Sequence, residues 1–142
     1  MCRFHSTVDG YAATALVDLP SLAGELGVAR VLAKFEDDRF GLPAFKGLGA
    51  SWAIHRALAE GHDITPVTPI VAATDGNHGR AVAHFARLSG HPAIIVLPRG
   101  VSDAATQAIR DEGPEVLIID DDYDAAVKTA EDIARERRGI HV

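Results

Sequence analysis

The sequence of 142 residues has one cysteine, one tryptophan and only 6% aromatic residues, and its apolar runs are short. The single cysteine, Cys2, excludes an internal disulfide, and no zinc-type spacing of cysteine and histidine occurs. No apolar run approaches the roughly 20 residues that cross a bilayer. The first residues lack the apolar core and cleavage site of a signal peptide. We therefore expect a cytoplasmic protein without a metal site or a membrane partner.

Acidic residues outnumber basic ones by 20 to 14, which gives a formal net charge of −6. A protein that binds the nucleic-acid backbone usually presents a basic surface, so we expect no nucleic-acid partner. The hydrophobic share of 47% and the charged share of 24% are typical of a globular chain, and the length corresponds to about one domain.

The second half of the sequence alternates between short aliphatic runs and amphipathic stretches. The aliphatic runs predict buried strands over residues 70–73, 93–97, 115–119 and 139–142. The stretches between them predict helices over residues 79–89, 103–112 and 123–138. This alternation predicts an α/β fold, a three-layer open parallel sheet with helices on both faces. The first half is less regular and predicts helices over 21–26 and 49–60 and a strand over 31–35.

Two loops of this fold contain residues suited to chemistry. In the loop of residues 39–51, Lys46 follows Phe45 among small residues, where desolvation would favour a neutral, nucleophilic amine. A surface lysine in a glycine-rich turn is also consistent with this sequence. The loop of residues 74–79 lies between a strand and a helix, so backbone amides suited to an anion would lie beside Asn77. A plain turn with Asn77 as the helix cap fits equally well.

Together, and in this order, the two loops resemble those of the fold-type II pyridoxal-phosphate-dependent enzymes. That group includes the tryptophan synthase β subunit and the serine and threonine dehydratases. The sequence is most similar to diaminopropionate ammonia-lyase. The segments that carry this resemblance are Phe4-His5, Gly10-Tyr11 and residues 39–46 and 74–80. Asp75 favours this enzyme, because the dehydratases typically have a serine-containing second loop. The resemblance covers nearly the whole chain and implies the N-terminal part of a tryptophan synthase β-like fold.

The resemblance implies pyridoxal 5'-phosphate as the cofactor and assigns a role to four residues. Lys46 would be the Schiff-base lysine and the base at the substrate Cα. Asn77 would hydrogen-bond the 3-hydroxyl group of the cofactor, with Phe45 close to it. Asp75 would be a second acid/base on the opposite face of Cα, so that both enantiomers are accepted. The implied reaction is the α,β-elimination of ammonia from 2,3-diaminopropionate, a small amino acid, to give pyruvate and ammonia.

The resemblance also implies how the chain is organised. Residues 1–48 would contribute to the cofactor domain and carry the Schiff-base lysine, and residues 49–142 would form a small α/β domain. These enzymes need a glycine-rich loop for the cofactor phosphate, and they are usually homodimers. Because the sequence ends at Val142 before such a loop, we expect a C-terminally truncated protein that binds the cofactor weakly or not at all.

Two other functions stay open on the sequence. A serine or threonine dehydratase of the same cofactor type would use the same lysine and asparagine. A catalytically silent α/β fragment would instead bind an anion or another chain. The two classes differ in their need for Lys46, because a binding module would not depend on that amine.

Overall fold

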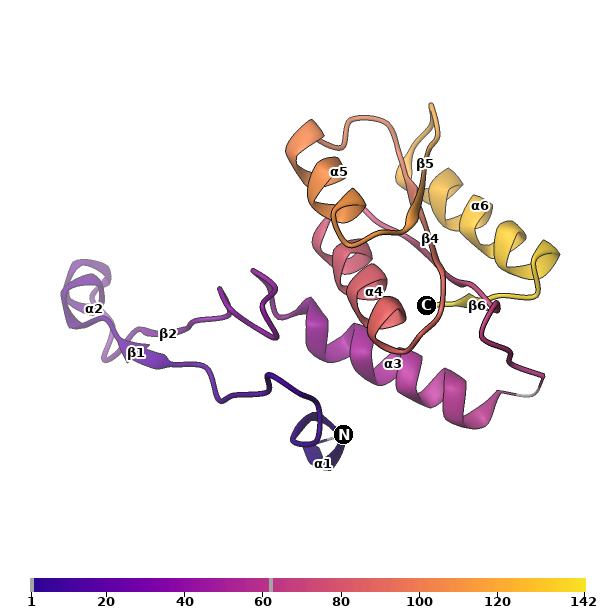
Figure 1. The fold of residues 1–142 in the computed structure, drawn as a ribbon. Coiled ribbons are helices and arrows are strands. Elements are labelled where there is room, and N and C mark those ends of the chain that lie inside the picture. The colour runs from indigo at the N-terminus through magenta and orange to yellow at the C-terminus, as the bar shows by residue number, and fades with distance from the viewer. Residues whose placement is uncertain (1, 62) are drawn as a thin grey trace. The chain divides into compact units, whose positions relative to one another are not determined.

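The computed structural model describes residues 2–61 and 63–142, in two compact units that meet in sequence between Phe45 and Lys46 (Figure 1). The second unit contains a parallel four-stranded sheet in the order β5-β4-β3-β6. Its strands are β3 (Ile70–Ala73), β4 (Ala93–Leu97), β5 (Glu115–Ile118) and β6 (Ile140–His141). Its helices are α3 (Lys46–Glu60), α4 (Asn77–Leu88), α5 (Asp103–Arg110) and α6 (Tyr123–Glu136).

The strand order determines which helices cover which face of the sheet. The chain moves outward from β3 to β4 and β5, then returns past β3 to β6. Because parallel crossovers are right-handed, this reversal puts α4 and α5 on one face and α6 on the other. Helix α6 contacts β3, β4 and β6, whereas α3 packs against α4. The predicted three-layer α/β fold is therefore confirmed.

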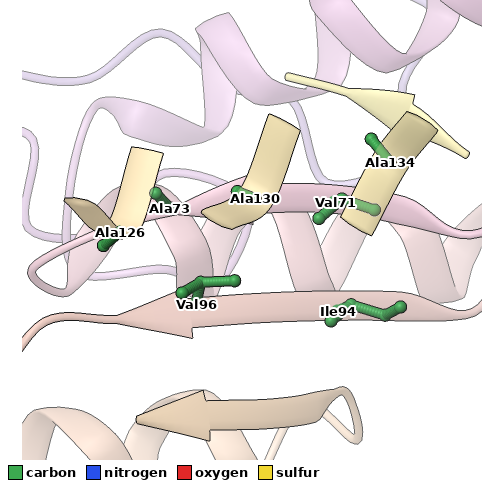
Figure 2. Close-up of a cluster of buried hydrophobic side chains, with 7 residues drawn as sticks. All are labelled: Val71, Ala73, Ile94, Val96, Ala126, Ala130 and Ala134. Atoms are coloured by element: carbon green, nitrogen blue, oxygen red, sulfur yellow. The ribbon is translucent and has the colours of Figure 1, made fainter. Parts of the chain in front are cut away.

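Small residues on α6 allow this helix to lie close to the sheet. Three alanines at a spacing of four residues form its buried stripe. Figure 2 shows them over side chains of β3 and β4, in a cluster of Val71, Ala73, Ile94, Val96, Ala126, Ala130 and Ala134. Every residue of β3 and β4 is buried, as expected for strands covered on both faces. The sheet is thus a rigid support for the loops at its ends.

The helix caps in this unit follow the sequence closely. Ser102 and Asp122 accept hydrogen bonds from the backbone N–H groups of Ala105 and Ala125, at 3.3 and 2.9 Å, and so begin α5 and α6. The helix predicted to begin at residue 49 begins at Lys46 instead. Glycines at 47 and 49 lower intrinsic helix propensity, but burial of a helical stripe that includes Gly47, Ala50 and Ile54 outweighs it.

The first unit contains a short antiparallel pair of strands. Its elements are α1 (Cys2–His5), β1 (Leu16–Asp18), α2 (Pro20–Leu26) and β2 (Leu32–Lys34). The predicted helix ending at Gly27 and the predicted strand near residue 33 are confirmed, whereas α1 and β1 were not predicted. In residues 2–61 and 63–142, no helix is long and apolar enough to span a membrane.

A buried arginine organises the end of the first unit. The guanidinium of Arg39, only 5% exposed, donates to both carboxylate oxygens of Glu36, to Thr14 Oγ1 and to the Ala12 carbonyl. The hydrogen bond from Arg39 is the main cause that lowers the pKa of Glu36 to about 2. This network connects two segments that are more than twenty residues apart in the sequence, and it holds the turn that precedes residues 43–46.

Candidate active site

An open pocket of about 350 Å³ lies at the carboxyl end of β3. Its lining comes from the first turns of α3 and α4, the loop between β3 and α4, and the first residue of α6: Lys46, Thr74, Asp75, Gly76, Asn77, His78 and Tyr123. The strand order reverses between β3 and β6, and ligands of open α/β sheets bind outside the carboxyl ends of strands at such a reversal. This pocket is therefore the candidate active site of the second unit.

Thr74 holds the loop between β3 and α4 in its shape. Its Oγ1 accepts hydrogen bonds from the backbone N–H groups of Gly76 and Gly79, each at 3.0 Å. Its methyl group packs so closely on Gly79 that a Cβ at residue 79 would lie 2.2 Å from Thr74 Cγ2. The glycine is required here by close packing. Thr74 therefore satisfies an N–H group in the first turn of α4 from outside the helix, while the cap position is Gly76, so the interpretation of Asn77 as the cap is wrong.

Asn77 and Asp75 are both exposed and both line the pocket. Asn77 is the first residue of α4, and the cap position before it is Gly76. Within the part of the chain that the structure describes, neither side chain forms a hydrogen bond or an ion pair. Their amide and carboxylate groups are therefore available to a ligand in the pocket.

Lys46 lies on the first turn of α3, where its side chain lines the same pocket as Asp75 and Asn77. The lysine is exposed, so the expected desolvation behind Phe45 is absent from this chain. Lys46 is the first residue of α3, and the buried stripe of this helix begins at the next residue, Gly47. Phe45 ends the first unit and is 58% exposed, and its role at the cofactor stays a prediction.

His78 links the pocket to the end of the neighbouring strand β6. Its Nε2 lies 3.5 Å from the carbonyl oxygen of Val142, the residue that follows β6. Burial lowers the pKa of His78, and the positive charge of Lys46 lowers it further, although the Val142 carbonyl acts in the opposite direction. A neutral imidazole is the result at neutral pH, so the pocket has one cationic side chain, Lys46, among its lining residues.

A sequence profile of the family described as "Pyridoxal-phosphate dependent enzyme" matches residues 8–142. The chain belongs to this family. It is 39% identical to the diaminopropionate ammonia-lyase of Salmonella typhimurium, over 94% of this chain and 38% of that enzyme. It is 33% identical to the biosynthetic L-threonine dehydratase of Pasteurella multocida, over 87% of this chain and 23% of that enzyme.

Solved structures of this pyridoxal-phosphate-dependent family share the fold. The crystal structure of Escherichia coli diaminopropionate ammonia-lyase in complex with D-serine matches with a TM-score of 0.91 at 34% identity. The match covers 99% of this chain and 40% of that chain. The chain thus spans about two fifths of the length of the ammonia-lyases that it resembles. The family inferred from the two loops is confirmed.

The structure brings together three of the four predicted site residues, since Lys46, Asp75 and Asn77 line one pocket. Four lining residues lie outside the predicted site set: Thr74, Gly76, His78 and Tyr123. Thr74 could have been found from its place at the end of a buried strand, where a hydroxyl can accept loop N–H groups. Tyr123 follows β5 as Thr74 follows β3, and the rule that carboxyl ends of parallel strands converge would have indicated it.

Proposed function

We propose that this pocket binds pyridoxal 5'-phosphate and eliminates ammonia from a small diamino acid, 2,3-diaminopropionate. The observation that carries the proposal is one pocket lined by a primary amine, an amide and a carboxylate, from Lys46, Asn77 and Asp75. An aromatic aldehyde with a ring hydroxyl fits this set, because an amine can hold the aldehyde and an amide can pair with the hydroxyl. Family membership and 39% identity to an ammonia-lyase support the same chemistry.

Each of the three residues has a distinct task in this proposal. Lys46 would hold the cofactor through Nζ and take the proton from the substrate Cα. Asp75, exposed and without an ion pair in the described part of the chain, would exchange a proton on the other face of Cα. Asn77 would orient the cofactor ring through its hydroxyl. When bound, the cofactor supplies an electron sink for the pair left on Cα.

The backbone at the start of α4 supports an amino-acid substrate. Asn77 and His78, in the first turn of α4, line the pocket, and helix N-termini favour anions such as a carboxylate. The net reaction consumes one water and converts 2,3-diaminopropionate to pyruvate and two molecules of ammonia. We further propose that residues 1–48 contribute to the cofactor domain, that the complete enzyme is a homodimer, and that it is cytoplasmic.

Release of a 2-oxo acid distinguishes the possible functions, since diaminopropionate and serine give pyruvate whereas threonine gives 2-oxobutyrate. The complete enzyme, supplied with pyridoxal phosphate, is given diaminopropionate, serine or threonine, and the rate with free cofactor alone is subtracted. We expect a rate with diaminopropionate at least about tenfold above that of Lys46→Ala, because that variant lacks the amine. Asp75→Asn should lower the rate with one enantiomer much more than with the other, since each base acts on one face.

Two results would contradict the proposal. A rate that favours threonine or serine over diaminopropionate would assign the site to a dehydratase, the function of the Pasteurella multocida relative. Equal rates for the wild-type chain and Lys46→Ala with all three amino acids would show a silent binding module. Leu88→Ala changes an exposed residue at the end of α4 outside the pocket lining. It is the control for purification and cofactor addition, and its rate should equal that of the wild type.

A further inference from the structure

Tyr123 is an aromatic residue in a place where the fold does not need one. It is the first residue of α6, and its side chain is 45% exposed, whereas the apolar stripe of α6 begins at Ala126. Within residues 2–61 and 63–142, its ring makes no ring contact and its hydroxyl makes no hydrogen bond. The ring nevertheless lines the pocket that contains Lys46. Packing and helix capping therefore leave this tyrosine without a structural role.

The backbone of Tyr123 is held firmly although its ring is not. The preceding residue, Asp122, caps α6 through Ala125 N–H at 2.9 Å, and the helix is fixed to β3 and β4 by its buried alanines. Lys46 is on α3, which packs against α4 on the other face of the sheet. The pocket is thus lined by the first residues of α3 and α4 from one face and of α6 from the other, with the loop of residues 74–76 between them.

We propose that Tyr123 is a further binding residue of this pocket, whose ring packs against a planar aromatic aldehyde held by Lys46. The proposal rests on the proposed function, since it takes Lys46 as the amine that holds the aldehyde. An aromatic ring contributes contact area and a preference for offset or edge-to-face packing on another ring. Tyr123 would therefore select for an aromatic aldehyde over an aliphatic one, a preference that the amine of Lys46 cannot provide by itself.

Separate titrations with an aromatic and an aliphatic aldehyde test this role. The purified chain is incubated with increasing pyridoxal phosphate or acetaldehyde and reduced with borohydride. Condensation at the amine releases one water, and the added hydride fixes the aldehyde as a stable amine. Peptide mass spectrometry then gives the fraction of Lys46 that is modified. We expect Tyr123→Ala to raise the half-saturating concentration of pyridoxal phosphate about two- to tenfold, the range of one aromatic contact, and to leave that of acetaldehyde unchanged.

Matched variants separate the ring from its hydroxyl and from general effects. Tyr123→Phe keeps the ring and should behave like the wild type. Leu88→Ala removes another exposed side chain of the same unit, away from the pocket lining, and should also behave like the wild type. Because Tyr123 is half exposed, its replacement should leave the unfolding temperature within about 2 °C of the wild type.

The outcomes of this experiment are distinguishable. An unchanged response of Tyr123→Ala to pyridoxal phosphate would overturn the role of Tyr123 and leave the proposed function standing. An equal loss for both aldehydes would also overturn it, because the variant would then act on the amine. Absence of any modification of Lys46 in the wild-type chain would overturn the proposed function, and the role of Tyr123 with it.

Discussion

Replacing Gly79 by alanine tests whether close packing at Thr74 determines the shape of the pocket loop. The added Cβ would lie 2.2 Å from Thr74 Cγ2 and 2.8 Å from Ile95 Cγ2, distances that real Cβ atoms do not show. Thr74 cannot rotate away without losing the two hydrogen bonds that its Oγ1 accepts, each at 3.0 Å. Ile95 is fully buried in β4, so it has little room to move.

The magnitude follows from three contributions. Overpacking a close-packed site costs about 1–3 kcal/mol, and each lost hydrogen bond costs about 1 kcal/mol. Alanine recovers about 1 kcal/mol of helix propensity relative to glycine. We therefore expect Gly79→Ala to lower the free energy of unfolding by about 3 kcal/mol. For a unit of this size that corresponds to a fall of about 15 °C in Tm, measured by far-UV circular dichroism.

Two further variants make this prediction specific. Gly49→Ala has no atom within 4 Å of the new Cβ and lies inside α3, so it should raise the stability by about 0.5–1 kcal/mol. Thr74→Ser keeps Oγ1 but removes Cγ2, so the double variant Thr74→Ser/Gly79→Ala should recover part of the loss. A Gly79→Ala chain as stable as the wild type, or a double variant no better than Gly79→Ala, would refute the packing explanation.

Three other substitutions test charges and backbone contacts elsewhere in the two units. Because the pKa of Glu36 is lowered to about 2, its ion pair with Arg39 should contribute about 2–3 kcal/mol to stability above pH 4.5. This contribution should be lost as the pH falls towards 2. Hydrogen exchange at the Leu42 amide should show the loss in the wild type and not in Glu36→Gln. Burial raises the pKa of Glu112, but hydrogen bonds from His84, Arg87 and Arg80 outweigh it and leave that pKa below its ordinary value. Glu112→Gln should therefore cost about 1–2 kcal/mol at neutral pH in urea unfolding, and the cost should shrink on acidification; a cost that grows instead would contradict this sign. Gly139→Ala places a Cβ 2.7 Å from the Pro69 carbonyl oxygen and should lower the unfolding free energy by about 1–3 kcal/mol, and an unchanged urea midpoint would exclude that contact.

The parallel sheet could be predicted because its strands are short, aliphatic and buried on both faces. All four strands lie within one or two residues of the runs that predict them. The strand β1 escaped prediction because its three residues are all exposed, and an exposed strand of that length leaves no periodic pattern. Helix α1 spans only four residues, which is too short to show a helical pattern in the sequence.

The candidate site shows a different limit of sequence reasoning. Lys46 and Asn77 could be found because each lies in a stretch of unusual local composition, residues 39–51 and 74–79. The start of α3 at Lys46 could not, since it depends on burial of Gly47 and Ala50, which intrinsic propensity opposes. Tyr123 is separated from Lys46 by 77 residues, so their common pocket follows only from the order of strands in the sheet.

The site of covalent capture tests the central claim most directly. The chain has three lysines, Lys34, Lys46 and Lys128, and all three are exposed, so the other two serve as internal controls of reactivity. The chain is treated with pyridoxal phosphate and borohydride, and each lysine's modification is quantified by peptide mass spectrometry. We predict that Lys46 is modified at concentrations at which Lys34 and Lys128 are not, and that excess diaminopropionate reduces this modification. Equal modification of the three lysines would contradict a binding site at Lys46.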